Sequence, residues 1–191
     1  MKPKIVVKFG GSNLKTHEDI LKVVNVIKLY KNPLVIIVSA FYGVTNLLTD
    51  IIVKATTDES HIIPFTESLS ELNTKIINSN ISNPDIRKAT SEKAAQRLAE
   101  LQKYLTGINY IGEVPEFIED LILSYGERLS SLILTAVLAD NGICSREALP
   151  EDMKLITNGE YHNSTVDFAV SEENVRKYLE EDCHFVVPGF Y

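Results

Sequence analysis

The 191-residue sequence has no tryptophan and only two cysteines, Cys144 and Cys183. These cysteines form neither a CxxC pair nor the even, closely spaced framework that small secreted domains use. A disulfide scaffold is therefore excluded as the basis of the fold. We expect a reducing, cytoplasmic location.

Long apolar runs and a positive net charge are also missing. No apolar run approaches the roughly 20 residues that span a bilayer, and the first residues show no signal-peptide pattern. The formal net charge is −7, whereas a nucleic-acid-binding surface needs a positive field to displace counterions. We expect neither a membrane nor a nucleic acid as a partner.

The composition that remains is typical of a soluble globular protein, with 45% hydrophobic and 24% charged residues. This balance predicts one domain, or most of one. Charge is uneven, because residues 1–54 hold eight lysines and only three acidic residues. That excess is compatible with a segment that handles phosphate, although solvated helix faces would explain it equally well.

The first 55 residues predict a parallel βαβ arrangement. Residues 4–9 form a short, mostly buried strand that Gly10-Gly11 ends, and residues 17–30 carry apolar side chains at helical spacing. The continuous β-branched run at 34–38 is typical of a strand covered on both faces. With the next helix starting near Val44, the sheet should be largely parallel.

The rest of the chain predicts a helical block followed by a return to strands. Glu172 and Glu173 should lie in the first turn of the last helix, where negative charge suits the helix dipole. The expected helices cover 65–80, 85–105, 115–139 and 171–182, and the expected strands cover 143–149 and 184–187.

Ligands of open parallel sheets bind where strands end, so the loops after the strands are the expected place for a binding or catalytic site. The first loop places Lys8 beside Gly10, Gly11 and Ser12 at the start of a helix. Backbone amides there can approach an anion closely, and a helix N-terminus favours negative charge. The loop resembles a phosphate cradle, but it matches neither a Walker A sequence nor a GxGxxG fingerprint. A simple turn is the alternative.

The second loop runs from Ser39 through Ala40 to Thr45 and Asn46. The hydroxyls of Ser39 and Thr45 can donate hydrogen bonds to a carboxylate. They could equally serve as helix caps or local turn formers.

The third element, Gly126-Glu127-Arg128, interrupts an apolar helical stretch. A glycine in mid-helix costs about 1 kcal/mol against alanine, and a buried carboxylate needs a partner. A cationic ligand group would be one partner for Glu127. The alternative is that Glu127 and Arg128 pair with charged neighbours.

Four motifs, in order, carry a resemblance to the aspartokinases. Residues 8–12 (KFGGS) resemble the family's KFGGT/S opening, and residues 38–48 are similar to its VSAxxGVTNLL loop. Residues 126–130 resemble its GERLS element, and residues 187–190 its VPGF strand end. The segment 105–128 is most similar to the aspartokinase part of bifunctional aspartokinase–homoserine dehydrogenases.

The resemblance implies the amino-acid-kinase fold, an α/β, three-layer αβα arrangement with a largely parallel sheet. It implies phosphorylation of the L-aspartate side-chain carboxylate by ATP with Mg²⁺, giving 4-phospho-L-aspartate for lysine, threonine and methionine biosynthesis. Lys8 would contact the transferring phosphoryl group, with Gly10, Gly11 and Ser12 around its oxygens. The aspartate pocket would contain Ser39, Ala40, Thr45, Glu127 facing the ammonium, and Phe190.

Departures from the family pattern set limits on the resemblance. Asn158 stands where the family often has aspartate. The sequence stops before the family's glycine-rich GRGGSD segment, so we expect residues 1–191 to be the N-terminal part of a catalytic domain, truncated before the nucleotide-binding portion and inactive alone. The full-length protein is expected to be a homo-oligomer.

Two other functions remain open from the sequence. One is a relative within the amino-acid kinases that acts on acetylglutamate, glutamate or a carbamate. The other is a non-catalytic substrate-binding or oligomerisation module, whose contact surface would be the apolar stripe Leu121, Leu129, Leu132, Ile133 and Leu138.

Overall fold

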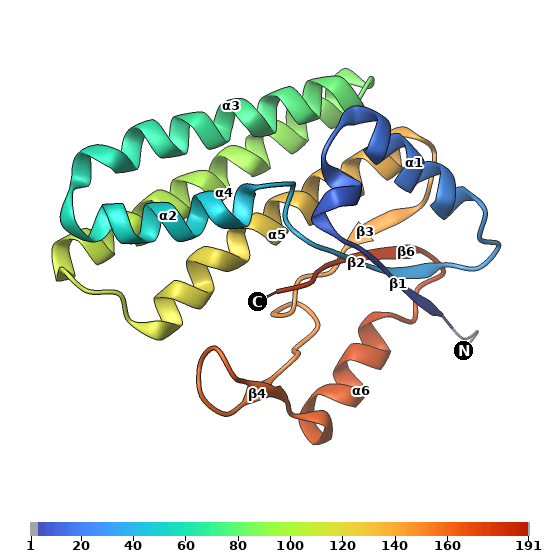
Figure 1. Cartoon of the computed structure of the whole chain (residues 1–191). Coiled ribbons are helices and arrows are strands. Elements are labelled where there is room, and N and C mark those ends of the chain that lie inside the picture. Colours follow the sequence, from blue (N-terminus) through green and yellow to red (C-terminus); the bar gives the residue numbers. More distant parts are fainter. Residues whose placement is uncertain (1–3, 191) are drawn as a thin grey trace.

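The structure is a computed structural model that describes residues 4–190. Residues 1–3, including one of the eight N-terminal lysines, and Tyr191 lie outside the described range. A four-stranded parallel sheet lies between two unequal helical layers, as the α/β, three-layer expectation requires (Figure 1). Its strand order is β1-β2-β6-β3, formed by Ile5–Phe9, Leu34–Val38, His184–Pro188 and Ser145–Glu147.

The position of each strand in the sheet explains its burial. β2 has neighbours on both sides, and four of its five residues are buried, as the β-branched run predicts. β1 was predicted to be mostly buried, and this is wrong: Ile5 is 47% exposed and Val6 66% exposed. β1 is the edge strand, so only the side chains on its inner face, such as Val7 and Phe9, pack against the core.

Five α-helices cover one face of the sheet and one covers the other (Figure 1). Leu34, Ile36 and Val38 of β2 point toward the larger layer, whereas Val35 packs with Phe185 and the last helix. The larger layer contains the 3-10 helix η1 (Gly11–Leu14) and helices α1 (His17–Lys28), α2 (Val44–Thr57), α3 (Ile62–Asn80), α4 (Pro84–Ile111) and α5 (Glu116–Asp140); η2 (Glu59–His61) joins α2 to α3, and α6 (Phe168–Tyr178) forms the smaller layer.

Helix α5 is the central helix of the larger layer. By length and composition alone it could cross a membrane, but 72% of its most apolar window is buried inside the protein. Leu129, Leu132, Ile133 and Leu138 are at most 6% exposed. The apolar stripe proposed as an oligomerisation surface is therefore mainly core.

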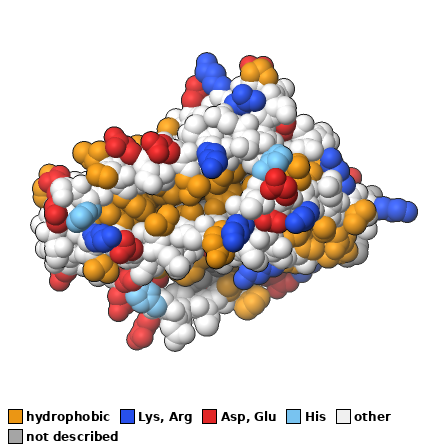
Figure 2. All heavy atoms as spheres, turned by 45° about the horizontal axis from the view of Figure 1, so that its top comes forward, with side chains coloured by type: hydrophobic (Ala, Val, Ile, Leu, Met, Phe, Trp, Pro, Cys, Tyr) orange, Lys and Arg blue, Asp and Glu red, His pale blue; other side chains and the backbone are white. Residues whose placement is uncertain are grey.

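Part of the outer surface of this helical layer remains apolar. Val53 of α2 is 68% exposed and Ile63 of α3 is 58% exposed. Figure 2, an oblique view of this side, shows hydrophobic side chains gathered in a band across the middle of the face, with lysine and arginine side chains beside it.

Two details near the C-terminus differ from the sequence-based expectations. Helix α6 begins at Phe168, where the Asp167 side chain accepts a hydrogen bond from the Val170 amide, so Glu172 and Glu173 lie beyond the first turn. An antiparallel pair, β4 (Thr157–Asn158) and β5 (Thr165–Val166), was not predicted. Two-residue strands are too short to show an alternating pattern in the sequence.

The two cysteines, remote in sequence, meet where β3 and β6 begin. Their sulfur atoms are 2.7 Å apart, and both are free thiols. Burial, together with the hydrogen bond between the two thiols, raises the pKa of the Cys183 thiol to about 12. Parallel pairing of the two strands creates this contact, which no sequence spacing indicates.

The close contact between α5 and the loop after β2 depends on Gly126. A Cβ added at Gly126 would lie 2.8 Å from the Ala40 Cβ and 3.3 Å from Leu48 Cδ1, with both neighbours in the core. This gives a packing reason for the glycine in mid-helix. It allows α5 to lie directly against the loop that follows β2.

We predict that Gly126→Ala destabilises the protein, whereas Gly107→Ala in α4 does not. The first substitution overpacks a buried contact, which costs about 1–3 kcal/mol. A Cβ at Gly107 meets nothing within 4 Å, so alanine there should add about 0.5–1 kcal/mol through helix propensity. Urea unfolding measures both, and equal stability of the two variants would contradict the packing argument.

Candidate active site

Three strands end side by side at one edge of the sheet. Phe9 of β1 pairs with Val38 of β2, and Val38 pairs with Pro188 of β6. Beyond the strands the Ser39 amide donates to the Phe9 carbonyl (3.1 Å), and the Gly189 amide donates to the Val38 carbonyl (2.9 Å). This register brings three of the four motifs that the sequence singled out into one place.

Lys8, near the end of β1, is exposed, and the first of these loops leads from β1 into η1. The Gly10 amide donates to Asn13 Oδ1 (3.1 Å), so it is engaged within the turn. The amides of Gly11 and Ser12 begin η1, where the first N–H groups of a helix have no partner in the helix. A Cβ at Gly10 would meet nothing within 4 Å. The loop thus presents a lysine, open space and two available amides.

The second loop presents its hydroxyls without using them internally. Helix α2 is preceded by Gly43, and no side chain caps it. Within residues 4–190, the hydroxyls of Ser39, which is half-buried, and Thr45, which is exposed, make no hydrogen bond. The capping alternative is therefore not observed for either residue. Ala40 is 4% exposed and packs beneath this loop against Gly126.

The third motif brings Glu127 from α5 to the same edge. Glu127 Oε2 is buried and receives no hydrogen bond from any described residue. Burial raises the pKa of the Glu127 carboxyl, while the backbone amides of Ala40 and Phe190 and the charge of Lys8 act in the opposite direction. Groups from all three loops therefore surround one carboxylate that lacks a full set of partners.

Arg128, the next residue, pairs with a charged neighbour, which was the alternative stated for both residues of the motif. Its guanidinium forms an ion pair with Glu151 (Nη1–Oε1 2.6 Å), and its Nε donates to Ser124 Oγ (3.1 Å). Arg97 of α4 pairs in the same way with Glu147 of β3 (2.7 Å). These pairs connect α4 and α5 to β3, the edge strand opposite β1, and to the segment after it. The charge of Arg128 is therefore already compensated.

Two residues of this region were missed by sequence reasoning. Ser130 Oγ donates to the Ser39 carbonyl (2.8 Å) and thereby fixes α5 to the second loop. Asn13 fixes the first loop through the Gly10 amide. The spacing between Glu127 and Ser130, one helical turn, was the available signal for Ser130, whereas nothing in the sequence distinguishes Asn13 from a solvent-facing residue.

A cavity of about 200 Å³ lies beside Phe190 and Gly189. The β4–β5 segment supplies its other wall through Thr157, His162 and Ser164, with Asp120 of α5. The His162 amide donates to Asp120 Oδ2 (3.0 Å) and fixes this segment to α5. Asn158, which departs from the family pattern, donates to Asp167 Oδ2 (2.7 Å) and is used structurally.

Comparison with known proteins identifies the family of the chain. Residues 3–191 match the family model described as the amino acid kinase family, and the chain belongs to that family. It is 26% identical over 190 residues to the bifunctional aspartokinase/homoserine dehydrogenase of Buchnera aphidicola, covering 97% of this chain and 23% of the relative. It is 28% identical over 195 residues to the chloroplastic aspartokinase 2 of Arabidopsis thaliana, covering 97% and 34%. The chain thus spans much less than half the length of these relatives.

Solved structures show the same fold. The chain superimposes on E. coli aspartokinase III in complex with aspartate and ADP with a TM-score of 0.82 and 17% identity, covering 97% of this chain and 40% of that one. For the aspartate kinase of Clostridium acetobutylicum the TM-score is 0.68 at 24% identity, covering 99% and 39%. These likenesses confirm the α/β fold class with its parallel sheet.

We predict that Glu127→Gln stabilises the unliganded protein at neutral pH. The pKa of Glu127 is higher in the folded protein than in the unfolded chain, so the wild type loses stability as pH rises through the interval between the two pKa values. Glutamine does not titrate, and its advantage should grow from pH 4 to pH 7. Urea unfolding at both pH values measures this. A variant with the same relative stability at both would contradict an unfavourably buried charge.

Proposed function

We propose that this chain is the aspartate-binding part of an aspartokinase, which transfers a phosphoryl group from ATP to the side-chain carboxylate of L-aspartate. The observation that carries the proposal is the buried Glu127 carboxylate, whose Oε2 has no hydrogen-bond partner among residues 4–190. An unpaired buried acceptor is costly, and a ligand ammonium supplies the missing donor and charge. The relatives named aspartokinase support this assignment.

In this proposal the site binds aspartate through both of its ends. Glu127 accepts hydrogen bonds from the ammonium, while the free hydroxyls of Ser39 and Thr45 donate to carboxylate oxygens. Ala40 shapes the loop from below, and Phe190, which is 38% exposed, contributes an apolar wall. The carboxylate of aspartate is already ionised at pH 7, so the reaction needs positioning and charge neutralisation, not a strong base.

The phosphoryl group lies, in this proposal, between aspartate and the first loop. Lys8 supplies positive charge, and the amides of Gly11 and Ser12 donate to phosphoryl oxygens at the start of η1. Gly10 leaves open space for the approach, although its own amide is engaged by Asn13. Mg²⁺ would enter with the nucleotide phosphates and neutralise their charge. The described residues contain no cluster of three or more His, Cys, Asp or Glu that would hold a metal ion.

Discrimination between L-aspartate and succinate tests the ammonium contact. Succinate keeps both carboxylates and lacks the ammonium, so the wild-type chain should bind aspartate about 10- to 100-fold more tightly, the value of one charge-assisted hydrogen bond. Glu127→Gln should remove this preference by weakening aspartate alone. Isothermal titration calorimetry measures both ligands.

Glu116→Gln provides the matched control, because it removes the same charge from an exposed position at the start of the same helix. Wild-type discrimination in Glu127→Gln would show that Glu127 does not contact the ammonium. Tighter binding of N-acetyl-L-glutamate or L-glutamate than of aspartate would instead favour another amino-acid kinase.

Lys8 is expected to act on the reaction and not on aspartate binding. In an enzyme that contains this chain, Lys8→Ala should lower kcat by about 100-fold or more, because charge that develops at the phosphoryl group loses its counter-charge. The KM for aspartate should change little. Steady-state kinetics with varied aspartate at saturating MgATP separates the two constants, and an unchanged kcat would remove Lys8 from the reaction.

A further inference from the structure

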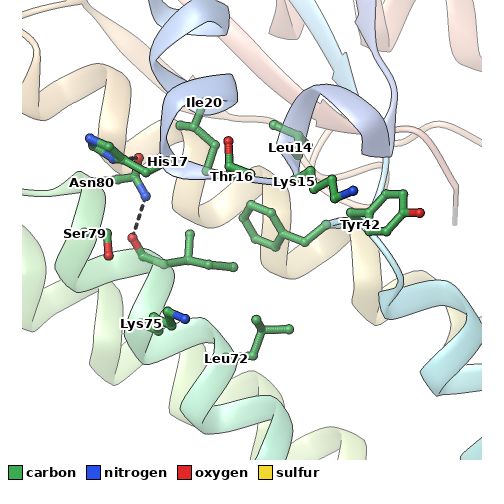
Figure 3. Close-up of a pocket in the computed structure, with 12 residues that line it drawn as sticks. Leu14, Lys15, Thr16, His17, Ile20, Tyr42, Leu72, Lys75, Ser79 and Asn80 are labelled. Carbon is green, nitrogen blue, oxygen red and sulfur yellow. Dashed lines mark hydrogen bonds between the residues drawn. The ribbon is translucent and has the colours of Figure 1, made fainter.

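A second cavity, of about 300 Å³, shares no lining residue with the cavity beside Phe190. It is enclosed by the η1–α1 junction, the loop after β2 and helix α3 (Figure 3). Its apolar walls come from all three segments: Leu14 and Ile20, Phe41, and Leu72 with Ile76. Its volume is at the lower limit for small-molecule pockets, about 300 Å³, so it suits a small ligand.

The charged side chains around this cavity are all cationic. Lys15 and Lys75 line it, and no aspartate or glutamate does. Neither lysine forms an ion pair with a described residue. Lys15 Nζ lies 4.5 Å above the Tyr42 ring, at the edge of the cavity (Figure 3). The cavity therefore selects an anion and offers no carboxylate to an ammonium group.

One wall of the cavity is polar and held in place. Asn80 is 7% exposed; its Nδ2 donates to the Ile76 carbonyl (2.8 Å; Figure 3), which assigns Oδ1 as the acceptor that faces His17 Nδ1 (2.9 Å). His17 Nδ1 is consequently the donor in this contact. Thr16 and Ser79 complete this wall. The Thr16 hydroxyl already donates to Asp19 Oδ2 (2.9 Å) as the cap of α1, whereas the Ser79 hydroxyl has no partner among residues 4–190.

The same loops that form the candidate active site form this cavity. Phe41 and Tyr42 directly follow Ser39 and Ala40, and Leu14 ends the 3-10 helix that starts at Gly11. The two loops touch, because a Cβ at Gly11 would lie 3.1 Å from the Ala40 carbonyl oxygen. A ligand in the cavity would contact both loops through residues other than those proposed to bind aspartate.

We propose that this cavity is a second binding site, for a small monocarboxylate with an apolar body and no ammonium group. The carboxylate lies among Lys15, Lys75 and the Ser79 hydroxyl, and the apolar body lies against Phe41, Leu72 and Ile76. Occupancy changes the affinity for aspartate, because the ligand and aspartate contact the same loop. The coupling rests on the proposed function, whereas the binding does not.

The probe is 3-phenylpropanoate, with 3-phenylpropanamide as its uncharged analogue. Titration of ¹⁵N-labelled chain should shift the amide signals of Thr16, Ser79 and Asn80, with a dissociation constant on the order of 1 mM for a ligand of this size. The amide analogue should bind at least about tenfold more weakly. No shifts at these residues, or equal binding of the two probes, would overturn the proposal.

Two double variants test the charges. Lys15→Gln with Lys75→Gln should weaken 3-phenylpropanoate by about tenfold or more, whereas Lys31→Gln with Lys88→Gln, both exposed lysines outside the cavity, should bind as the wild type does. All variants are expected to keep their fold, because each change is at an exposed side chain. Thermal unfolding that matches the wild type checks this. Equal weakening by both pairs would show non-specific attraction and overturn the site.

Calorimetric titration of aspartate with and without saturating 3-phenylpropanoate tests the coupling. We expect the aspartate dissociation constant to change at least about threefold in the wild type and not in the Lys15→Gln, Lys75→Gln variant. Probe binding without aspartate binding would contradict the proposed function and would still support the cavity as a binding site. Aspartate binding that the bound probe does not change would overturn the coupling.

Discussion

The close contact between helix α5 and the loop after β2 is the constraint on which the candidate site depends. Gly126 allows the contact, since a single added methyl group would lie 2.8 Å from the Ala40 Cβ. Ser130 fixes it with a hydrogen bond to the Ser39 carbonyl. Glu127 lies between these two residues in sequence, so the same packing that joins the helix to the loop also brings a carboxylate beside the ends of β1, β2 and β6. Stability and site geometry therefore have one origin.

This arrangement leaves Glu127 in an environment that does not favour its charge. The charge of neighbouring Arg128 is compensated by Glu151, and that of Arg97 by Glu147. These ion pairs lie at β3, the edge of the sheet opposite β1, and not at Glu127. Backbone amides and the charge of Lys8 act on Glu127, and its Oε2 has no hydrogen-bond partner among residues 4–190. Protein interiors satisfy most polar atoms internally. An exception at the edge where parallel strands end is typical of a site whose partner is a ligand.

The two loops at this edge have a second, apolar side. Phe41 and Leu14 line a cavity with lysines at its margin. A ligand bound to such a loop at one site can change the affinity at the other site, because both sites share the backbone of the loop. The candidate active site and the second cavity are thus formed by the same pair of loops.

Local pattern in the sequence determined most of the elements. The β-branched run at Leu34–Val38 and the long helices were recognisable because strand and helix periodicities are short-range. The four motifs were recognisable because each is a short continuous segment. The same motifs identified Lys8, Ser39, Thr45 and Glu127 as candidates, and residues 3–191 match the amino acid kinase family. Only the tertiary structure decided that β1 is an edge strand, that Cys144 meets Cys183, that Arg128 is paired and Glu127 is not, and that Asn13 engages Gly10. Each of these depends on which strands become neighbours and how closely helices approach them, and such contacts join residues whose separation along the chain carries no local signal.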